Sequence, residues 1–377
     1  MSEFDKVINR FDTDSVRWDK YNSDIIPLWV ADMDFETPRC VTDAISERLK
    51  HKVFGYTHAP SHLKEDIAHY VEKQFDWQID PEWIILTPSL VSNLYSIAQT
   101  ITETEDHIMT LQPVYHHLFQ AASLSGRDYT SVPLDTNNHR LTLCADALKR
   151  FQKKNTRLLF FCNPHNPGGS VYSKTELNEI ATYCVDNKII ICSDEIHCNM
   201  THNDYTHTPI ASLSSDIADQ TITLMSLNKV FNIPGVGLAW IICKNKDMRK
   251  KIQAQIGTII PDPQIFSYIS TQAALKDGES WRHELIKYLE NNKTLLKNNI
   301  EQMYPLKLYA MEASYLAWID CSQLKHKDPA QFFLEHGIAL QPGSMFRQED
   351  HVRINIATPA SVLNEALKRM QTGLESI

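Results

Sequence analysis

Short apolar runs alternate with longer amphipathic stretches between residues 83 and 192, and this alternation restricts the fold more than any other feature of the chain. The runs are typical of buried strands, and the stretches between them carry apolar residues at helical spacing. The expected strands are 83–86, 107–111, 158–162 and 189–192, and the expected helices are 91–101, 115–125 and 174–187. Two further apolar runs, 221–225 and 236–243, extend the series. The sequence therefore predicts an α/β fold with a mostly parallel sheet covered by helices on both faces.

The remaining segments are expected to flank this sheet. A chain of 377 residues is long enough for two domains. We expect an N-terminal arm and joining segment at 1–45, a large domain at 46–275 and a small α+β domain at 276–377. After residue 244 we expect helices to about residue 303. Beyond it, strands are expected at 315–319 and 352–356, and helices at 329–336 and 362–370.

Composition excludes several classes of function. A net charge of −9 without a basic cluster argues against nucleic-acid binding. No apolar run approaches the roughly 20 residues of a membrane span, and the first residues lack the apolar core of a signal peptide. The eight cysteines are scattered without zinc-type spacing, so we expect reduced thiols, no bound metal and a cytoplasmic location.

One lysine stands between two of the expected strands. Lys229 lies in a loop after the run 221–225 and is followed by Val230 and Phe231, a poor setting for solvation. Burial lowers the pKa of a lysine, and a neutral amine is what carbonyl chemistry requires. An ordinary lysine at a loop tip explains this stretch equally well.

An aspartate at the end of another expected strand favours a functional role for Lys229. Asp194 follows the apolar run 189–192, where it is either a cap or a site carboxylate. In open α/β sheets, ligands bind beyond the carboxyl ends of the strands, where Asp194, Asn163 and Ser226 all fall. A lysine for a Schiff base and an aspartate for a pyridinium nitrogen are the protein groups that pyridoxal phosphate (PLP) needs most.

Taken together, these motifs resemble the aspartate-aminotransferase-like PLP enzymes of fold type I, and most closely the bacterial cystathionine β-lyase-like C–S lyases. The resemblance covers nearly the whole chain. It rests on PLWVADMDF at 27–35, FGY at 54–56, NPHNPGG at 163–169, SDEIH at 193–197, the lysine motif from Ser226 to Gly235, and SYLAWID at 314–320.

The resemblance implies roles for residues around the cofactor ring. Lys229 would hold PLP and act as the base at Cα, and Asp194 would keep the pyridine nitrogen protonated. Asn166 would hydrogen-bond the phenolic oxygen and contact substrate. His197 stands where aminotransferases carry a tyrosine making that contact, although a structural histidine is an equally good interpretation. Tyr115 would stack on the ring, the alternative being a core tyrosine that opens a helix.

The resemblance also implies residues that bind the cofactor phosphate and the substrate carboxylate. The resemblance places the phosphate at the start of the helix near Leu90, with Ser89, Leu90, Val91 and Ser226 as ligands. Tyr56 would reach the phosphate of a neighbouring subunit, which makes a homodimer the functional unit. Arg353 would bind the substrate carboxylate through its bidentate fork, helped by main chain near Ala31 and by Tyr115. An isolated arginine is more often a surface charge, but this one lies in an apolar strand.

Three departures from the family pattern affect these expectations. Aminotransferases carry a phosphate-binding arginine eight residues after the lysine, where this chain has Gly237. The residue before the lysine is Asn228 instead of Ser or Thr. The loop 341–350 lacks a glycine-rich turn, so we expect an altered substrate range or a mobile lid there.

The activity implied is a PLP-dependent β-elimination that cleaves L-cystathionine or a related cysteine S-conjugate to a thiol, pyruvate and ammonia. An aminotransferase using the same cofactor site is the first alternative. A regulatory role, in which the surface binds another protein alongside lyase activity, is the second, and no tail or basic module in the sequence supports it.

Overall fold

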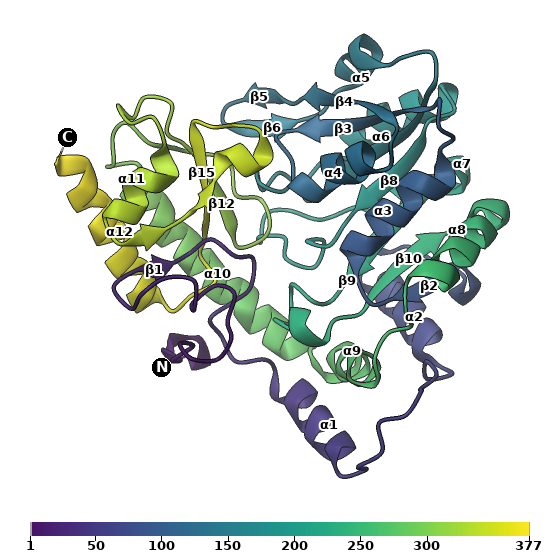
Figure 1. The fold of residues 1–377 in the computed structure, drawn as a ribbon, viewed down its shortest axis with the longest axis horizontal. Helices are drawn as coiled ribbons and strands as arrows, with labels where there is room; N and C mark the ends of the chain where they lie inside the picture. Colours follow the sequence, from purple (N-terminus) through teal and green to yellow (C-terminus); the bar gives the residue numbers. More distant parts are fainter. Residues whose placement is uncertain (1, 377) are drawn as a thin grey trace.

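The computed structural model describes residues 2–376, and a seven-stranded sheet forms the body of the molecule (Figure 1). Its spatial order is β2 (Ile84–Thr87), β10 (Ala239–Cys243), β9 (Thr221–Ser226), β8 (Ile190–Asp194), β7 (Thr156–Cys162), β3 (His107–Gln112) and β4 (Asp128–Pro133). Only β10 runs antiparallel to its neighbours, β2 and β9. The α/β class and the mostly parallel sheet are confirmed. Strands β8, β9 and β10 are buried at every position, which is why they appear as continuous apolar runs.

Two groups of helices cover this sheet, as the sequence predicts. One group contains α3 (Leu90–Ile101), α4 (His116–Leu124) and α8 (Lys246–Ile259), in which α3 packs against both others. The other contains α5 (Ala145–Phe151), α6 (Lys174–Asp186) and α7 (Ser215–Asp219), in which α6 contacts both others. Helix α6 begins with a reciprocal capping box between Ser173 and Glu176, a sequence signal for a helix start.

Two details of the large sheet differ from expectation. The strand expected at 236–243 begins only at Ala239, because Pro234–Val236 forms a 3₁₀ turn. The sequence predicts no helix or strand in the segment 128–151. The structure has four there: β4, a hairpin of β5 (Asp135–Asn137) and β6 (Arg140–Thr142), and α5. Strand β4 lies at the sheet edge and is mostly exposed or half-buried, so it lacks the apolar run that identifies a central strand.

A second, smaller sheet is formed by the last part of the chain. Its order is β11 (Lys307–Leu308), β12 (Leu316–Asp320), β15 (His351–Asn355) and β14 (Gln341–Pro342), all antiparallel. It is accompanied by α10 (Glu279–Ile300), α11 (Pro329–Glu335) and α12 (Ala360–Glu375). The N-terminal segment contributes β1 (Ile26–Pro27), which pairs in parallel with β13 (Ile338–Ala339). Segments from opposite ends of the chain therefore lie side by side (Figure 1).

The connection between the N-terminal segment and the large sheet projects from the body. Helix α1 (Arg39–Leu49) packs against α9 (Ile265–Asp277), and the chain then loops outward before α2 (Leu63–Phe75) (Figure 1). No helix within residues 2–376 is both long enough and apolar enough to cross a membrane.

Candidate functional site

A cavity of about 460 Å³ lies at the carboxyl ends of the large sheet, where it meets the smaller one. Loops after β2, β3, β7, β8 and β9 each deliver side chains to it, and β15 and the segment before α1 close the other side. The cavity brings together most of the residues singled out in the sequence: Ala31, Ser89, Leu90, Val91, Tyr115, Asn166, Asp194, His197, Lys229 and Arg353.

Lys229 projects its amine into this cavity from the loop after β9. Nζ donates a hydrogen bond to the carbonyl of Ala31 at 2.8 Å. Burial lowers the pKa of Lys229 to about 8, and the nearby charge of Arg353 lowers it further, while Asp32 and Asp194 oppose the shift. A minor fraction of the amine is therefore neutral near physiological pH, and only this neutral form can take part in carbonyl chemistry.

Asp194 ends β8 and is almost fully buried. Its Oδ1 accepts a hydrogen bond from the backbone N–H of Ile196 at 3.1 Å. Burial raises the pKa of Asp194 to about 7, and the charge of neighbouring Glu195 acts in the same direction. Within residues 2–376 no cation lies within ion-pair distance of this carboxylate. A cationic N–H donor placed in the cavity would resolve this electrostatic cost.

Arg353 and Asn166 both line the cavity and are hydrogen-bonded to each other. Arg353 lies in β15, and its Nη1 donates to Asn166 Oδ1 at 3.0 Å while Nη2 donates to the carbonyl of Trp29 at 3.0 Å. Burial lowers the pKa of Arg353 to about 10. Its Nε is buried and has no hydrogen-bond partner among the described residues.

His197 and Tyr115 form two more walls. Burial, together with the charges of Lys229 and Arg353, lowers the pKa of His197 to about 3, so the imidazole is neutral. Its Nδ1 has no partner within the described residues. Tyr115 precedes α4, and burial raises its pKa to about 12, which keeps the phenol protonated.

The start of α3 provides the anion-binding end of the cavity. Ser89 is the N-cap, and its hydroxyl accepts a hydrogen bond from the N–H of Ser92. The first amides of a helix have no partner inside it, and the helix dipole adds a partial positive charge there. Leu90 and Val91 line the cavity at this point.

Asn228 and Gly237, two of the three departures from the family pattern, are in direct contact. Asn228 Oδ1 accepts from the N–H of Leu238 at 3.1 Å. A Cβ added to Gly237 would lie 2.2 Å from Asn228 Nδ2, so the Asn228 side chain fills the space that a larger residue at 237 would occupy. Asn228 also lines the cavity.

Two of the expected site residues do not line the cavity in a single chain. The Ser226 hydroxyl donates to the carbonyl of Leu238 at 2.7 Å and accepts from the N–H of Asn228 at 3.0 Å, so it shapes the loop that carries Lys229. Tyr56 is fully exposed in the projecting connection between α1 and α2. Its expected role across a subunit interface stays a prediction.

Further lining residues come from the loop 341–350, which the sequence predicts to shape the substrate pocket, and from two positions, Trp29 and His116, for which the sequence predicts no role. Trp29, His116, Gln341, Met345 and Phe346 complete the wall between the two sheets. Gln341 to Phe346 fall within the loop for which the sequence predicts an altered substrate range. For His116, which follows Tyr115 at the start of α4, position beside an expected site residue was the available signal.

Comparison with known proteins agrees with this geometry. The family model "Aminotransferase class I and II" matches residues 23–370. Cystathionine beta-lyase PatB of Bacillus subtilis is 32% identical, covering 98% of this chain and 99% of its own. The crystal structure of OvoB is 36% identical with a TM-score of 0.97, covering 99% of both chains. The PLP-bound C–S lyase of Staphylococcus hominis is 30% identical with a TM-score of 0.93, also covering 99% of both chains.

These similarities extend over the large sheet, the small sheet and the cavity between them, because the matched residues begin before β1 and end within α12. The chain belongs to the class I and II aminotransferase family.

Proposed function

We propose that this protein is a PLP-dependent C–S β-lyase that cleaves L-cystathionine or a related cysteine S-conjugate. The observation that carries the proposal is one cavity holding a lysine of lowered pKa and a buried aspartate without a cationic partner among the described residues. Relatives named cystathionine beta-lyase and C–S lyase, similar over nearly the full chain, support the reaction class.

The open polar groups of the cavity fit PLP. Asp194 suits a pyridinium N–H, which would remove the cost of its buried charge. The amides at residues 89–91 suit a phosphate, and Asn228 adds a side-chain amide at the same end. Asn166 and the neutral His197 would hydrogen-bond the phenolic oxygen, Tyr115 would cover the ring face, and Lys229 would hold the cofactor covalently.

PLP supplies an electron sink that acidifies the Cα proton of an amino acid joined to it. Arg353, which lines the cavity, would bind the substrate carboxylate and so orient Cα toward Lys229. The Lys229 amine, displaced from the cofactor by the substrate amine, would then remove the Cα proton. The electron pair left at Cα would form the Cα–Cβ double bond as the thiolate leaves with the Cβ–S electrons. The proton held by Lys229 can neutralise the thiolate, and water converts the remaining fragment to pyruvate and ammonia.

The proposed functional unit is a homodimer in the cytoplasm. Tyr56 would complete the phosphate site of the neighbouring subunit, since it is fully exposed in a single chain. All eight cysteines are unpaired, which suits a reducing compartment.

The test is a visible spectrum of the purified protein followed by a coupled pyruvate assay with L-cystathionine. We expect a visible absorbance band from bound PLP that disappears in Lys229→Ala, together with pyruvate formation in the absence of any keto acid. Loss of a catalytic base lowers rates by about 10²–10⁴-fold, so the variant should be almost inactive. A protein that shows no band after incubation with PLP would contradict the proposal.

The same assay separates the lyase from an aminotransferase. An aminotransferase would convert its cofactor to the amine form after one turnover and then stop until a keto acid is supplied. Turnover that depends on added keto acid, without release of thiol, would replace the proposed function with transamination.

A further inference from the structure

The segment Trp29–Asp34, which we name the strap, offers its main-chain carbonyls to the cations of the cavity. The carbonyl of Trp29 accepts from Arg353 Nη2 at 3.0 Å. The carbonyl of Ala31 accepts from Lys229 Nζ at 2.8 Å and from the hydroxyl of Tyr315 at 3.0 Å. The strap therefore fixes where two proposed site residues point.

The strap has no regular structure that would hold these carbonyls in place. Residues 28–34 belong to neither a helix nor a strand. Side chains from other elements support it instead. Asn355 Nδ2 donates to the carbonyls of Val30 and Asp32, both at 2.6 Å. Asn232, three residues after Lys229, bonds both the N–H and the carbonyl of Met33, at 3.0 and 3.1 Å.

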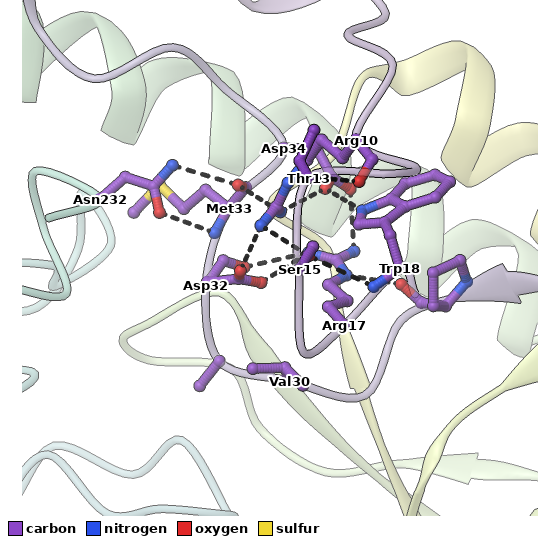
Figure 2. A network of polar contacts seen from close by, with 12 residues as sticks. Arg10, Thr13, Ser15, Arg17, Trp18, Val30, Asp32, Met33, Asp34 and Asn232 are labelled. Atoms are coloured by element: carbon purple, nitrogen blue, oxygen red, sulfur yellow. Dashed lines mark hydrogen bonds and ion pairs between the residues drawn. The ribbon is translucent and has the colours of Figure 1, made fainter. Parts of the chain in front are cut away.

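Ion pairs and hydrogen bonds connect the strap to the N-terminal arm (Figure 2). Arg10 pairs with Asp32 at 2.6 Å and with Asp34 at 2.9 Å. Arg17 pairs with Asp34 at 2.9 Å and donates to the carbonyl of Asp32 at 3.0 Å. Its Nε also donates to the carbonyl of Pro27 at 2.6 Å. Two cations thus meet two anions on a short stretch of coil.

Burial makes this network stiff. The Arg17 side chain is 0% exposed and that of Asp34 is 3% exposed, whereas Arg10 and Asp32 are 21% and 17% exposed. Water competes weakly for such ion pairs, and an arginine fork fixes direction as well as distance. A displacement of about 1 Å in a site can cost about 10²-fold in rate, so stiffness of the support is a functional property.

We propose that Arg10 and Arg17 are positioning residues that, through Asp32 and Asp34, hold the strap so that its carbonyls orient Arg353, and also Lys229 whenever its amine is free. This inference rests on the proposed function, because it assigns Arg353 to the substrate carboxylate. Arg17 is so deeply buried that its loss would disturb folding. Arg10 lies at the margin of the network and is the residue to test.

The experiment compares the holoenzyme variants Arg10→Gln and Arg10→Lys with Lys6→Ala. Lys6 lies on the same arm, where it pairs with Glu36 at an exposed position outside the network, so it serves as the matched control. Three quantities are measured: amide hydrogen exchange in residues 29–34, the dissociation constant for L-alanine from the change in visible spectrum, and kcat and KM for L-cystathionine.

In Arg10→Gln we expect exchange in the strap to accelerate at least tenfold, the L-alanine dissociation constant and KM to rise about tenfold, and kcat to change less than KM. Arg10→Lys should fall between this variant and wild type, because lysine keeps the charge but not the fork. Lys6→Ala should match wild type in all three. Unchanged exchange and unchanged L-alanine affinity in folded Arg10→Gln would overturn the proposal, as would equal losses in Lys6→Ala.

Failure of the proposed function gives a different pattern. A wild-type protein that binds L-alanine but forms no pyruvate lacks the lyase activity, while exchange and amino-acid affinity still report on the strap. If the strap proposal alone fails, wild type and Arg10→Gln form pyruvate with the same KM.

Discussion

Asp194 shows at the residue scale how a binding site is maintained at the expense of stability. The folded chain raises the pKa of this carboxyl from 3.8 to about 7, mainly by burial. Below pH 3.8 the group is protonated whether the chain is folded or unfolded. Above pH 7 the folded state must bury a carboxylate. The stability contributed by the protonated group is therefore lost as the pH rises from about 4 to about 7.

The first prediction concerns the PLP-free protein. A pKa unit corresponds to about 1.4 kcal/mol, so the loss at Asp194 is on the order of 4 kcal/mol across this window. Asp194→Asn removes the titration and should gain free energy of unfolding relative to wild type between pH 4 and pH 8. Urea unfolding of both PLP-free proteins at the two pH values measures this. If the free energy of unfolding of Asp194→Asn differs from that of wild type by the same amount at both pH values, the carboxyl titrates normally.

The second prediction concerns the contact between Gly237 and Asn228. Gly237 has φ −71°, so alanine is compatible with the backbone and only the contact with Asn228 opposes it. Gly237→Ala should displace the Asn228 side chain from the N–H of Leu238 and cost about 1–2 kcal/mol of stability. The same substitution in an Asn228→Ala background should cost less. Urea unfolding of the four proteins gives the coupling energy, and strict additivity would refute the contact.

The site residues that could be predicted are those with a local signature. Asp194 and Lys229 follow strongly apolar strands, and Asn166 and Arg353 lie in motifs of the family. The network of Arg10 and Arg17 has no such signature, because its acidic partners Asp32 and Asp34 lie 15 to 24 residues away in coil and show no periodicity. Ser226 matched the motif, yet its hydroxyl bonds to the loop that carries Lys229.

At the scale of elements, the same distinction separates central strands from edges. Continuous apolar runs such as β8 and β9 were predicted because both faces of these strands are covered. Strand β4 was missed, since an edge strand with exposed positions resembles a loop in sequence. The beginning of β10 was misplaced because Val236 is apolar but belongs to the turn opened by Pro234.

The loop 341–350 provides the third prediction. Arg347 ties it to the large sheet: Nη2 donates to the Tyr129 hydroxyl at 2.6 Å, and the guanidinium lies 4.0 Å from the ring centre of Phe119. The ring centre of Phe346, the preceding residue, lies 5.0 Å from the guanidinium carbon of Arg353. Asparagine tolerates the left-handed backbone at this position, so Arg347→Asn removes the contacts with Tyr129 and Phe119.

We expect Arg347→Asn to raise KM for cysteine S-conjugates severalfold, because Phe346 is released from Arg353. The thermal midpoint should change little, since an exposed cation–π contact contributes about 0.5–1 kcal/mol. Glu349→Ala, an exposed change in the same loop, is the control. Comparing L-cystathionine, L-cystine and L-methionine shows whether the loop also sets substrate range. An unchanged KM for L-cystathionine and L-cystine, the two compounds with a Cβ–S bond, would exclude a role for these contacts of Arg347.

At the scale of the whole molecule, the projecting connection between α1 and α2 exposes apolar side chains. Val53 and Phe54 are 64% and 56% exposed, and Tyr56 is fully exposed. Apolar side chains exposed together on a projecting loop are typical of an interaction surface. A symmetric dimer would cover them and bring each Tyr56 to the other subunit's site.

The fourth prediction tests this exchange by mixing two variants, each of which lacks one group of the proposed shared site. Lys229→Ala lacks the base, and Tyr56→Phe lacks the hydroxyl proposed to reach the partner's phosphate. A mixed dimer would contain one site with both groups intact, formed by Lys229 of one subunit and Tyr56 of the other, and one site with neither. Random mixing makes about half of the dimers mixed, so about a quarter of all sites should be intact.

Mixing equal amounts after partial unfolding and refolding should therefore restore pyruvate formation to about a quarter of the wild-type rate, well above the sum of the separate variants. Each variant refolded alone is the control for activity gained by refolding itself. If Tyr56 instead serves the site of its own subunit, each site of a mixed dimer lacks one group, and mixing restores nothing. The outcome thus distinguishes a site shared between two chains from a site complete within one.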